Sequence, residues 1–317
     1  MRIALVGPGL MSIPPNGWGA VESLIWDYYC NLKINHTTEI INNRNLQEVI
    51  QHINKKEFDI VHIMYDDYVI IAPYLLKCNK IYLTTHYAYI THPQFKEKYS
   101  GYFNNIFMQA INNKDKIKIN VISTKIKEIY IKYGFPENRI NVLHNGARED
   151  KFIFYENPEK TGKSIYLAKI EERKRQFVYQ NIENIDFVGN YANSSFNRNN
   201  KNYLGHWTKD LLYKNLSHYG NLVLLSNGEA DPLVVKEGLI AGLGVVVSEC
   251  ASENLDLSKP YITVISDKKL NDLKYVEDMI IKNREISIKM RDKIREYALN
   301  NFSWKKVIEK YIKLISV

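Results

Sequence analysis

The sequence contains few of the residues that build disulfide scaffolds, metal sites or membrane spans. Its 317 residues include three cysteines, Cys30, Cys78 and Cys250, which are far apart, odd in number and without the spacing of metal ligands. We therefore expect a reducing compartment, with no structural disulfide and no zinc site. No run of about 18 apolar residues occurs, and the chain enters a strand pattern at its first residues. These absences predict no transmembrane helix, no signal peptide and a cytoplasmic protein.

Two further absences narrow the function. No Gly-x-x-x-x-Gly-Lys-Ser/Thr loop occurs, which argues against a P-loop nucleotidase. The net charge of +8 is spread over the whole chain, which is too diffuse for a nucleic-acid-binding stripe, so we expect no nucleic-acid partner. Residues 95–132 hold a local excess of lysine near an aromatic segment, which would suit an anionic membrane. A solvated helix face explains this segment better, so peripheral membrane contact is the less favoured interpretation.

Apolar runs alternate with helical patterns along the whole chain. Such alternation predicts βαβ units and parallel sheets. The expected strands are residues 2–7, 37–41, 59–64, 80–85, 119–123, 164–168, 185–189, 222–226, 244–248 and 261–265. The length exceeds the usual size of one core, and the polar stretch 149–163 is the expected seam. We predict an α/β protein with two doubly wound domains, residues 1–150 and 151–300, and a one-sided helix at 301–317.

The most informative stretch, residues 228–237, reads GEADPLVVKE and carries two acids, Glu229 and Glu237, where a buried strand gives way to a helix. Ligands of open α/β sheets bind beyond the carboxyl ends of the strands, so acids placed there can face a small molecule. Pro232 suits the start of the helix. The amides of the first turn, at Leu233 and Val234, would then form an anion site beside Glu229. A ligand with both phosphate and hydroxyl groups, such as a nucleotide sugar, matches this pattern.

This stretch resembles the signature of the retaining glycosyltransferases of family 4, which have the GT-B fold. Their signature is a Glu, seven intervening residues and a second Glu, followed by small residues and a β-run, here residues 239–249. The resemblance implies that Glu229 and Asp231 contact the donor sugar and that Glu237 contacts the ribose. It also implies two Rossmann-like domains that face a cleft, with a closing helix that contains Trp304 and packs back on the N-terminal domain.

A second segment, LAKIEERKRQ at residues 167–176, matches the family pattern Gly-Arg-Leu-x-x-x-Lys-Gly. Lys169 stands where the family has Arg, and Lys174 matches the later Lys. The resemblance implies that these two cations stabilise the charge that grows on the diphosphate as the sugar leaves. Lysine keeps the charge at position 169 but lacks the bidentate fork of arginine. Arg173 and Arg175 are interpreted as surface charges.

Two segments of the first half also match the family. In the glycine-rich loop after the first expected strand, Gly19 and Ala20 stand for a Gly-Gly pair whose backbone can approach a phosphate. His86 follows the expected strand 80–85 and matches a histidine that lies near the donor sugar and the acceptor. By resemblance, the catalytic residues are Glu229, Lys169, Lys174 and His86.

The loop after the first strand has a competing interpretation as a dinucleotide fingerprint, because Gly7 and Gly9 have the right spacing. Ser12 replaces the third glycine, and Arg44 rather than an acid follows the second strand. These departures disfavour NAD and leave NADP as an open alternative.

The residues and the resemblance together predict a retaining transferase that needs no cofactor and moves a sugar from a nucleoside diphosphate sugar to an acceptor. The acceptor hydroxyl would belong to a glycan, a lipid or a protein. No Asp-x-Asp occurs, which removes the usual metal-binding element of GT-A transferases, so we expect no metal requirement. The alternatives are an epimerase or hydrolase of the same fold and a non-catalytic module that binds nucleotide sugars.

Overall fold

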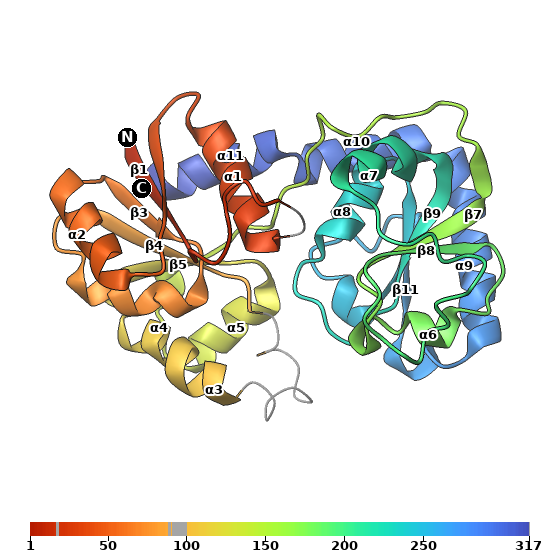
Figure 1. Cartoon of the computed structure of the whole chain (residues 1–317), viewed down its shortest axis with the longest axis horizontal. Helices are drawn as coiled ribbons and strands as arrows, with labels where there is room; N and C mark the ends of the chain where they lie inside the picture. The colour runs from red at the N-terminus through yellow and green to blue at the C-terminus, as the bar shows by residue number, and fades with distance from the viewer. Residues whose placement is uncertain (17–18, 88–89, 91–99, 317) are drawn as a thin grey trace. The chain divides into compact units, whose positions relative to one another are not determined.

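The structure is a computed structural model that describes residues 1–316 except 17–18, 88–89 and 91–99 (Figure 1). The chain divides into two compact units, Met1–Asn145 with Val307–Val317, and Gly146–Lys306. The first division therefore falls ahead of the polar stretch 149–163. Gly146 is the first residue of the second unit. A Cβ at this position would come within 2.7 Å of the Trp304 ring, which favours glycine there.

The first unit is built on a parallel six-stranded sheet in the order β2-β1-β3-β4-β5-β6. Its strands are β1 (Arg2–Gly7), β2 (Thr37–Asn42), β3 (Ile60–Ile63), β4 (Lys80–Thr85), β5 (Ile117–Val121) and β6 (Ile140–Val142). Its helical elements are α1 (Ala20–Leu32), α2 (Leu46–Lys56), η1 (Asp66–Tyr74), α3 (Ser100–Tyr102), η4 (Phe103–Phe107), α4 (Met108–Asn112), α5 (Thr124–Lys132) and η5 (Glu137–Arg139). The predicted strands of this half are confirmed, and β6 was not predicted because three residues show no periodicity.

The second unit has a parallel five-stranded sheet in the order β11-β10-β9-β7-β8. Its strands are β7 (Lys160–Leu167), β8 (Ile185–Val188), β9 (Tyr219–Leu224), β10 (Gly244–Ser248) and β11 (Ile262–Ile265). Its helical elements are η6 (Glu172–Lys174), α6 (Gln176–Tyr179), α7 (Lys209–Asn215), η7 (Leu216–His218), α8 (Leu233–Ile240), η8 (Glu249–Ala251), η9 (Asp267–Lys269), α9 (Leu273–Lys289) and α10 (Arg291–Phe302). All five predicted strands are present.

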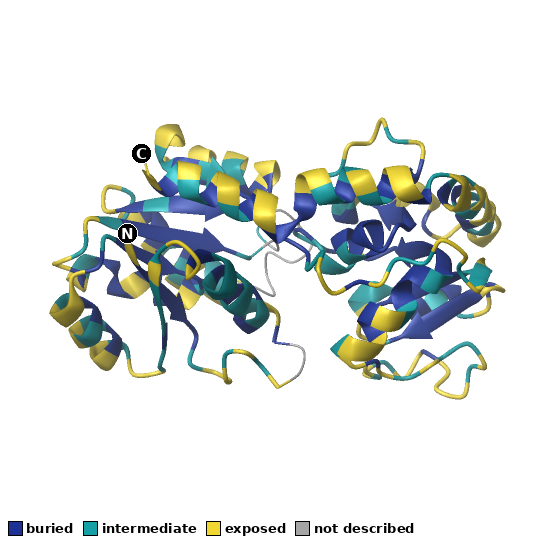
Figure 2. Cartoon of the chain, turned by 90° about the horizontal axis from the view of Figure 1, so that it is seen from above, coloured by how far each residue is buried: buried dark blue, intermediate teal, exposed yellow. Residues whose placement is uncertain are grey.

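The central strands are largely apolar because helices cover both faces of each sheet. Every residue of β9 and of β10 is buried, and Figure 2 shows most of the strand segments in both units in the dark blue of buried residues. Continuous burial explains why these strands read as unbroken apolar runs instead of alternating patterns.

The last helix, α11 (Trp304–Ser316), takes part in both units. At its start, the Trp304 backbone N–H donates to Glu149 at 3.0 Å. Further along, Tyr311 is fully buried in the first unit, where its ring stacks on His62 and its hydroxyl lies 3.0 Å from Nδ1 of that histidine. Burial lowers the pKa of His62 to about 3, so the ring is a neutral part of the core.

Candidate functional site

The strand order of the second unit places a topological switch point between β7 and β9. The chain leaves β7 toward β8 on one side of the sheet and later returns to β9 on the other side. In open α/β sheets, ligands bind beyond the carboxyl ends of the two strands that flank such a point. Lys169 and Lys174 follow β7, and Glu229 follows β9. The fold therefore brings the two segments singled out by sequence to the edge where a ligand is expected.

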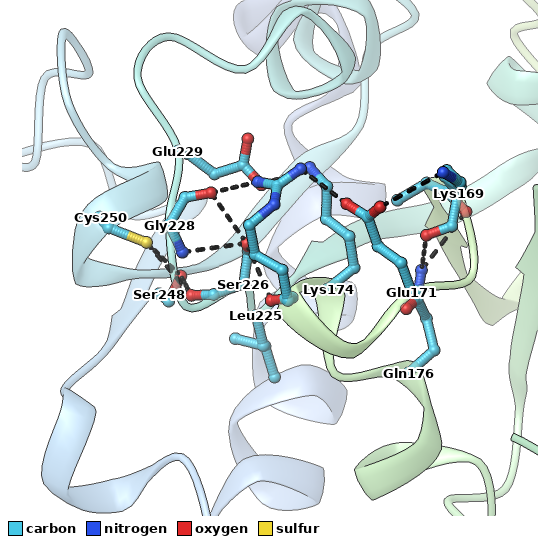
Figure 3. A network of polar contacts seen from close by, with 12 residues as sticks. Lys169, Glu171, Lys174, Gln176, Leu225, Ser226, Gly228, Glu229, Ser248 and Cys250 are labelled. Carbon is cyan, nitrogen blue, oxygen red and sulfur yellow. Dashed lines mark hydrogen bonds and ion pairs between the residues drawn. The ribbon is translucent and has the colours of Figure 1, made fainter. Parts of the chain in front are cut away.

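Glu229 is the centre of a network of charged side chains at this edge (Figure 3). The ammonium group of Lys174 contacts Oε1 of Glu229. Nη1 of Arg173 lies 3.2 Å from the same oxygen. The Glu229 side chain is 9% exposed and that of Lys174 is 12% exposed, so this pair is largely shielded from water but not sealed.

The network continues through Glu171 to Lys169. Nη2 of Arg173 donates to Oε1 of Glu171 at 2.8 Å, and Nζ of Lys169 lies 3.7 Å from Oε2 of the same carboxylate. Lys169 is the most open of these groups, with 58% of its side chain exposed. The result is a row of alternating charges in which Lys169, Glu171, Arg173, Glu229 and Lys174 follow one another.

The interpretation of Arg173 and Arg175 as surface charges is wrong. The Arg173 side chain is 25% exposed and joins Glu171 to Glu229. Arg175 has a left-handed backbone with φ of 57°, and its guanidinium donates to Asn271 Oδ1 at 2.6 Å. The family pattern leaves position 173 unspecified, so only the spacing of charges in the segment could have drawn attention to it.

Backbone contacts hold the two turns of this site together. The Tyr166 hydroxyl donates to the Lys174 carbonyl at 2.5 Å and accepts the Leu225 backbone N–H at 2.8 Å. The side-chain amide of Gln176, which is fully buried, donates to the Lys169 carbonyl at 2.9 Å. The positions of Lys169 and Lys174 are therefore set by the fold as well as by their charges.

Glu237 and the start of α8 lie next to this network in sequence but have separate contacts. Pro232 occupies the N-cap position, so Leu233 and Val234 form the first turn, where amides have no acceptor within the helix. Glu237 is 12% exposed and its Oε1 lies 3.2 Å from Nζ of Lys209. The helix thus offers both an anion-binding turn and a second partly open carboxylate.

The structure places Asp231 inside the unit, where it faces no ligand. Its side chain is 0% exposed and Oδ2 lies 2.5 Å from Nζ of Lys236, whose side chain is 2% exposed. Oδ1 accepts a hydrogen bond of 3.0 Å from the Asn254 amide. Burial lowers the pKa of Lys236, while the Asp231 carboxylate acts in the opposite direction. Because the Asp231 side chain has no exposed surface, a sugar hydroxyl cannot make the contact expected of this residue in this arrangement of the loop.

Gly19, Ala20 and His86 lie in the first unit. Gly19 precedes α1, and a Cβ there would come within 2.4 Å of Met11 Sδ, so a larger residue would require the Met11 side chain to move. Ala20 is the first residue of α1 and is exposed. His86 follows β4 directly, and its backbone N–H donates to Asp66 at 3.2 Å. Gly17 of the same loop and residues 95–99 of the lysine-rich segment lie outside the described residues.

Asp66 is a buried carboxylate of the first unit that the sequence analysis does not single out. It begins η1, and its Oδ1 accepts hydrogen bonds from Thr85 at 2.5 Å and from the Tyr102 hydroxyl at 2.9 Å. Burial raises the pKa of Asp66 although these hydrogen bonds oppose the shift. Asp66 therefore fixes the backbone at the end of β4, where His86 stands.

No group of three or more His, Cys, Asp or Glu side chains is placed to hold a metal ion among the described residues. None of the described helices combines the length and the apolar character needed to span a bilayer.

Comparison with known proteins agrees with this geometry. Residues 34–151 match the model of Glycosyltransferase Family 4. The structure of HepE (Alr3699) from Anabaena in complex with UDP-glucose is similar, with a TM-score of 0.76 at 11% identity over 100% of this chain and 99% of that one. Sucrose-phosphate synthase from Thermosynechococcus elongatus gives a TM-score of 0.72 at 12% identity, over 100% and 98% of the two chains. The chain has the GT-B fold.

The GT-B fold confirms the predicted α/β class with two Rossmann-like domains. The lipopolysaccharide outer core galactosyltransferase WaaB in its apo form shares it, with a TM-score of 0.68 at 16% identity, over 100% of this chain and 99% of that one. No curated protein matches the chain by sequence.

Proposed function

We propose that this protein is a retaining glycosyltransferase that moves a sugar from a nucleoside diphosphate sugar to an acceptor hydroxyl and needs no metal ion. The observation that carries the proposal is the row of charges around Glu229 at the switch point of a GT-B fold. Similar structures hold UDP-glucose in one case and UDP in another. The match of residues 34–151 to Glycosyltransferase Family 4 supports the same class of reaction.

In this proposal the donor lies across the carboxyl ends of β7 and β9. Lys169 and Lys174, with the first amides of α8, neutralise the diphosphate, since cations and helix N-termini both favour phosphate. Glu229 accepts hydrogen bonds from the sugar hydroxyls, and Glu237 accepts those from the ribose. Asp231 has no part in donor binding because its carboxylate is occupied by Lys236 and Asn254.

The chemistry requires stabilisation of negative charge more than a strong base. The bond between the sugar C1 and the phosphate oxygen breaks while a bond from C1 to the acceptor oxygen forms on the same face. The acceptor proton passes to the departing phosphate oxygen. Fixed cations in a partly shielded site stabilise the charge on that phosphate more strongly than water would. In this scheme the backbone at Gly19 and Ala20 approaches the phosphates, and His86 contacts the reacting sugar.

The proposal is tested first by binding and then by turnover. Thermal-shift measurements with UDP, GDP, ADP and their sugars should show stabilisation by one nucleotide series, because a ligand that binds only the folded state raises its stability. Release of the nucleoside diphosphate should then increase when glycan, lipid or protein acceptors are added and should persist in EDTA.

The product distinguishes the proposal from its alternatives. The anomeric proton signals of donor and product should show the same configuration by NMR. An inverted product would overturn the retaining mechanism, and loss of activity in EDTA would overturn metal independence. Release at the same rate without acceptor would indicate a hydrolase, a donor converted to its epimer would indicate an epimerase, and binding without turnover would indicate a binding module.

A further inference from the structure

Arg173 is a charged residue of the site to which the proposed function gives no role. It lies between the motif residues Lys169 and Lys174, and its guanidinium reaches across from η6 to the turn after β9. Nη1 donates to the Gly228 carbonyl as well as to Glu229, and Nη2 donates to Glu171. One planar group therefore bonds three acceptors that come from two turns.

The Arg173 backbone is held by the same turn that its side chain holds. Its carbonyl accepts the Asn227 backbone N–H at 2.9 Å and the Ser226 hydroxyl at 3.2 Å. Backbone and side chain thus bind the three residues that lead into Glu229 as well as the Glu229 carboxylate itself. An arginine fixed in this way leaves the Glu229 carboxylate little freedom to rotate.

The contacts of Glu229 show why Lys174 alone would not fix the orientation of its carboxylate. A lysine ammonium is a point charge on a flexible stem and sets no direction for the carboxylate that it meets. Arg173 and Lys174 contact the same oxygen, Oε1, so the two cations fix its place from two directions. The planar guanidinium also ties that oxygen to the Gly228 carbonyl, which a lysine at position 173 could not do while also reaching Glu171.

We propose that Arg173 is a positioning residue that orients Glu229 toward the donor sugar. This inference rests on the proposed function, because it assigns Glu229 to the sugar and the neighbouring lysines to the diphosphate. Arg173 acts through Glu229, so its removal should weaken recognition of the sugar and leave recognition of the nucleoside diphosphate nearly intact.

The test compares two ligands on each variant. Calorimetry gives the dissociation constants of UDP and UDP-glucose, with the GDP and ADP pairs in parallel. The constant of the nucleoside diphosphate divided by that of its sugar conjugate gives the contribution of the sugar to binding. In Arg173→Lys and Arg173→Gln we expect this ratio to fall about tenfold, the size of one lost charge-assisted contact. Glu229→Gln should lower the ratio similarly, and Arg173→Gln combined with Glu229→Gln should lower it no further, because both changes remove one interaction.

A matched control comes from the same turn. Glu172 is exposed beside Arg173, and Glu172→Ala should leave both constants unchanged. The inference is overturned if Arg173→Lys keeps the full ratio, or if the Arg173 variants weaken UDP and UDP-glucose equally, which would mean a general structural or diphosphate-binding role. Additive losses in the double variant would also overturn it. If the unaltered protein binds none of the nucleotides, the proposed function fails first and this inference fails with it.

Discussion

Glu229 and Asp231 lie two residues apart after β9, and each pairs with a lysine, but the two pairs have different surroundings. Glu229 and Lys174 are 9% and 12% exposed, and a second cation, Arg173, contacts the same carboxylate. Asp231 and Lys236 are 0% and 2% exposed. The first pair can exchange its partners with a ligand at the edge of the sheet. The second is enclosed, so it can only hold the loop between β9 and α8 in place. Both pairs join a carboxylate to a lysine. Their difference in exposure therefore assigns a ligand-binding role to the first pair and a structural role to the second.

The largest expected effect comes from breaking the enclosed pair. Asp231→Ala leaves the Lys236 ammonium buried without its carboxylate, which should lower the free energy of unfolding by about 3–5 kcal/mol. Urea denaturation measures this loss. The double variant Asp231→Leu with Lys236→Met should recover much of it, because no charge is then left unpaired. If Asp231→Ala unfolded at the same urea concentration as the unaltered protein, the pair would not be a structural anchor.

Breaking the open pair should affect activity more than stability. Lys174→Ala removes a cation from the diphosphate and should lower kcat about 100- to 1000-fold, as loss of one transition-state donor does elsewhere. Stability should fall by only about 1 kcal/mol, since Arg173 still pairs with Glu229. Steady-state kinetics and urea denaturation on the same preparation test both statements. Lys201→Ala, at an exposed position, is the control. Unchanged kcat in Lys174→Ala would contradict the role given to this lysine.

Glu237 extends the comparison to a third carboxylate, which is 12% exposed and contacts Lys209. Glu237→Ala should raise the dissociation constant of the nucleoside diphosphate about tenfold, because hydrogen bonds to the ribose are lost. Calorimetry measures the constant, and Asp210→Ala, at an exposed position on α7, provides the control. Unchanged nucleotide binding would refute the ribose role.

The smallest effect is expected for Tyr311 and His62, a buried pair in which neither side chain is charged. Tyr311→Phe removes the hydroxyl that lies 3.0 Å from His62 Nδ1 and should cost about 1 kcal/mol of unfolding free energy. Nucleotide affinity should not change, because Tyr311 belongs to the core of the first unit, whereas the turns that follow β7 and β9 belong to the second. Tyr133→Phe, at a hydroxyl of a 39% exposed residue, should be neutral in the same urea titration. If Tyr311→Phe lost as much unfolding free energy as Asp231→Ala, the large effect expected for the Asp231–Lys236 pair could not be attributed to its charges.

The fold could be predicted from sequence because buried parallel strands leave a strong local signal. The run GVVV, which makes up most of β10, has no polar side chain. Strand β6, with three residues, has no such signal and was recognised only from its pairing with β5. The seam was expected in the polar residues 149–163, and the second compact unit begins at Gly146.

The site was only partly predictable because burial is decided by distant segments. Glu229 and Lys174 lie in motifs, and the fold brings them together. Asp231 was expected to face the sugar from its place in the motif, but Asn254 and Lys236 enclose it, and neither contact can be read from the local pattern. Arg173 looked like one of several surface cations. Its role depends on the turn after β9, which lies more than fifty residues away in sequence.

Because α11 starts against Glu149 and ends against His62, the first unit lacks part of its interior until residues 304–316 have been synthesised. Folding of N-terminal domains usually begins while the chain is still on the ribosome. Here the half that is made first must wait for a piece that is made last. The nascent chain would expose the bare surface around His62 throughout translation of the second unit, and any truncation before residue 304 would leave that surface exposed for good.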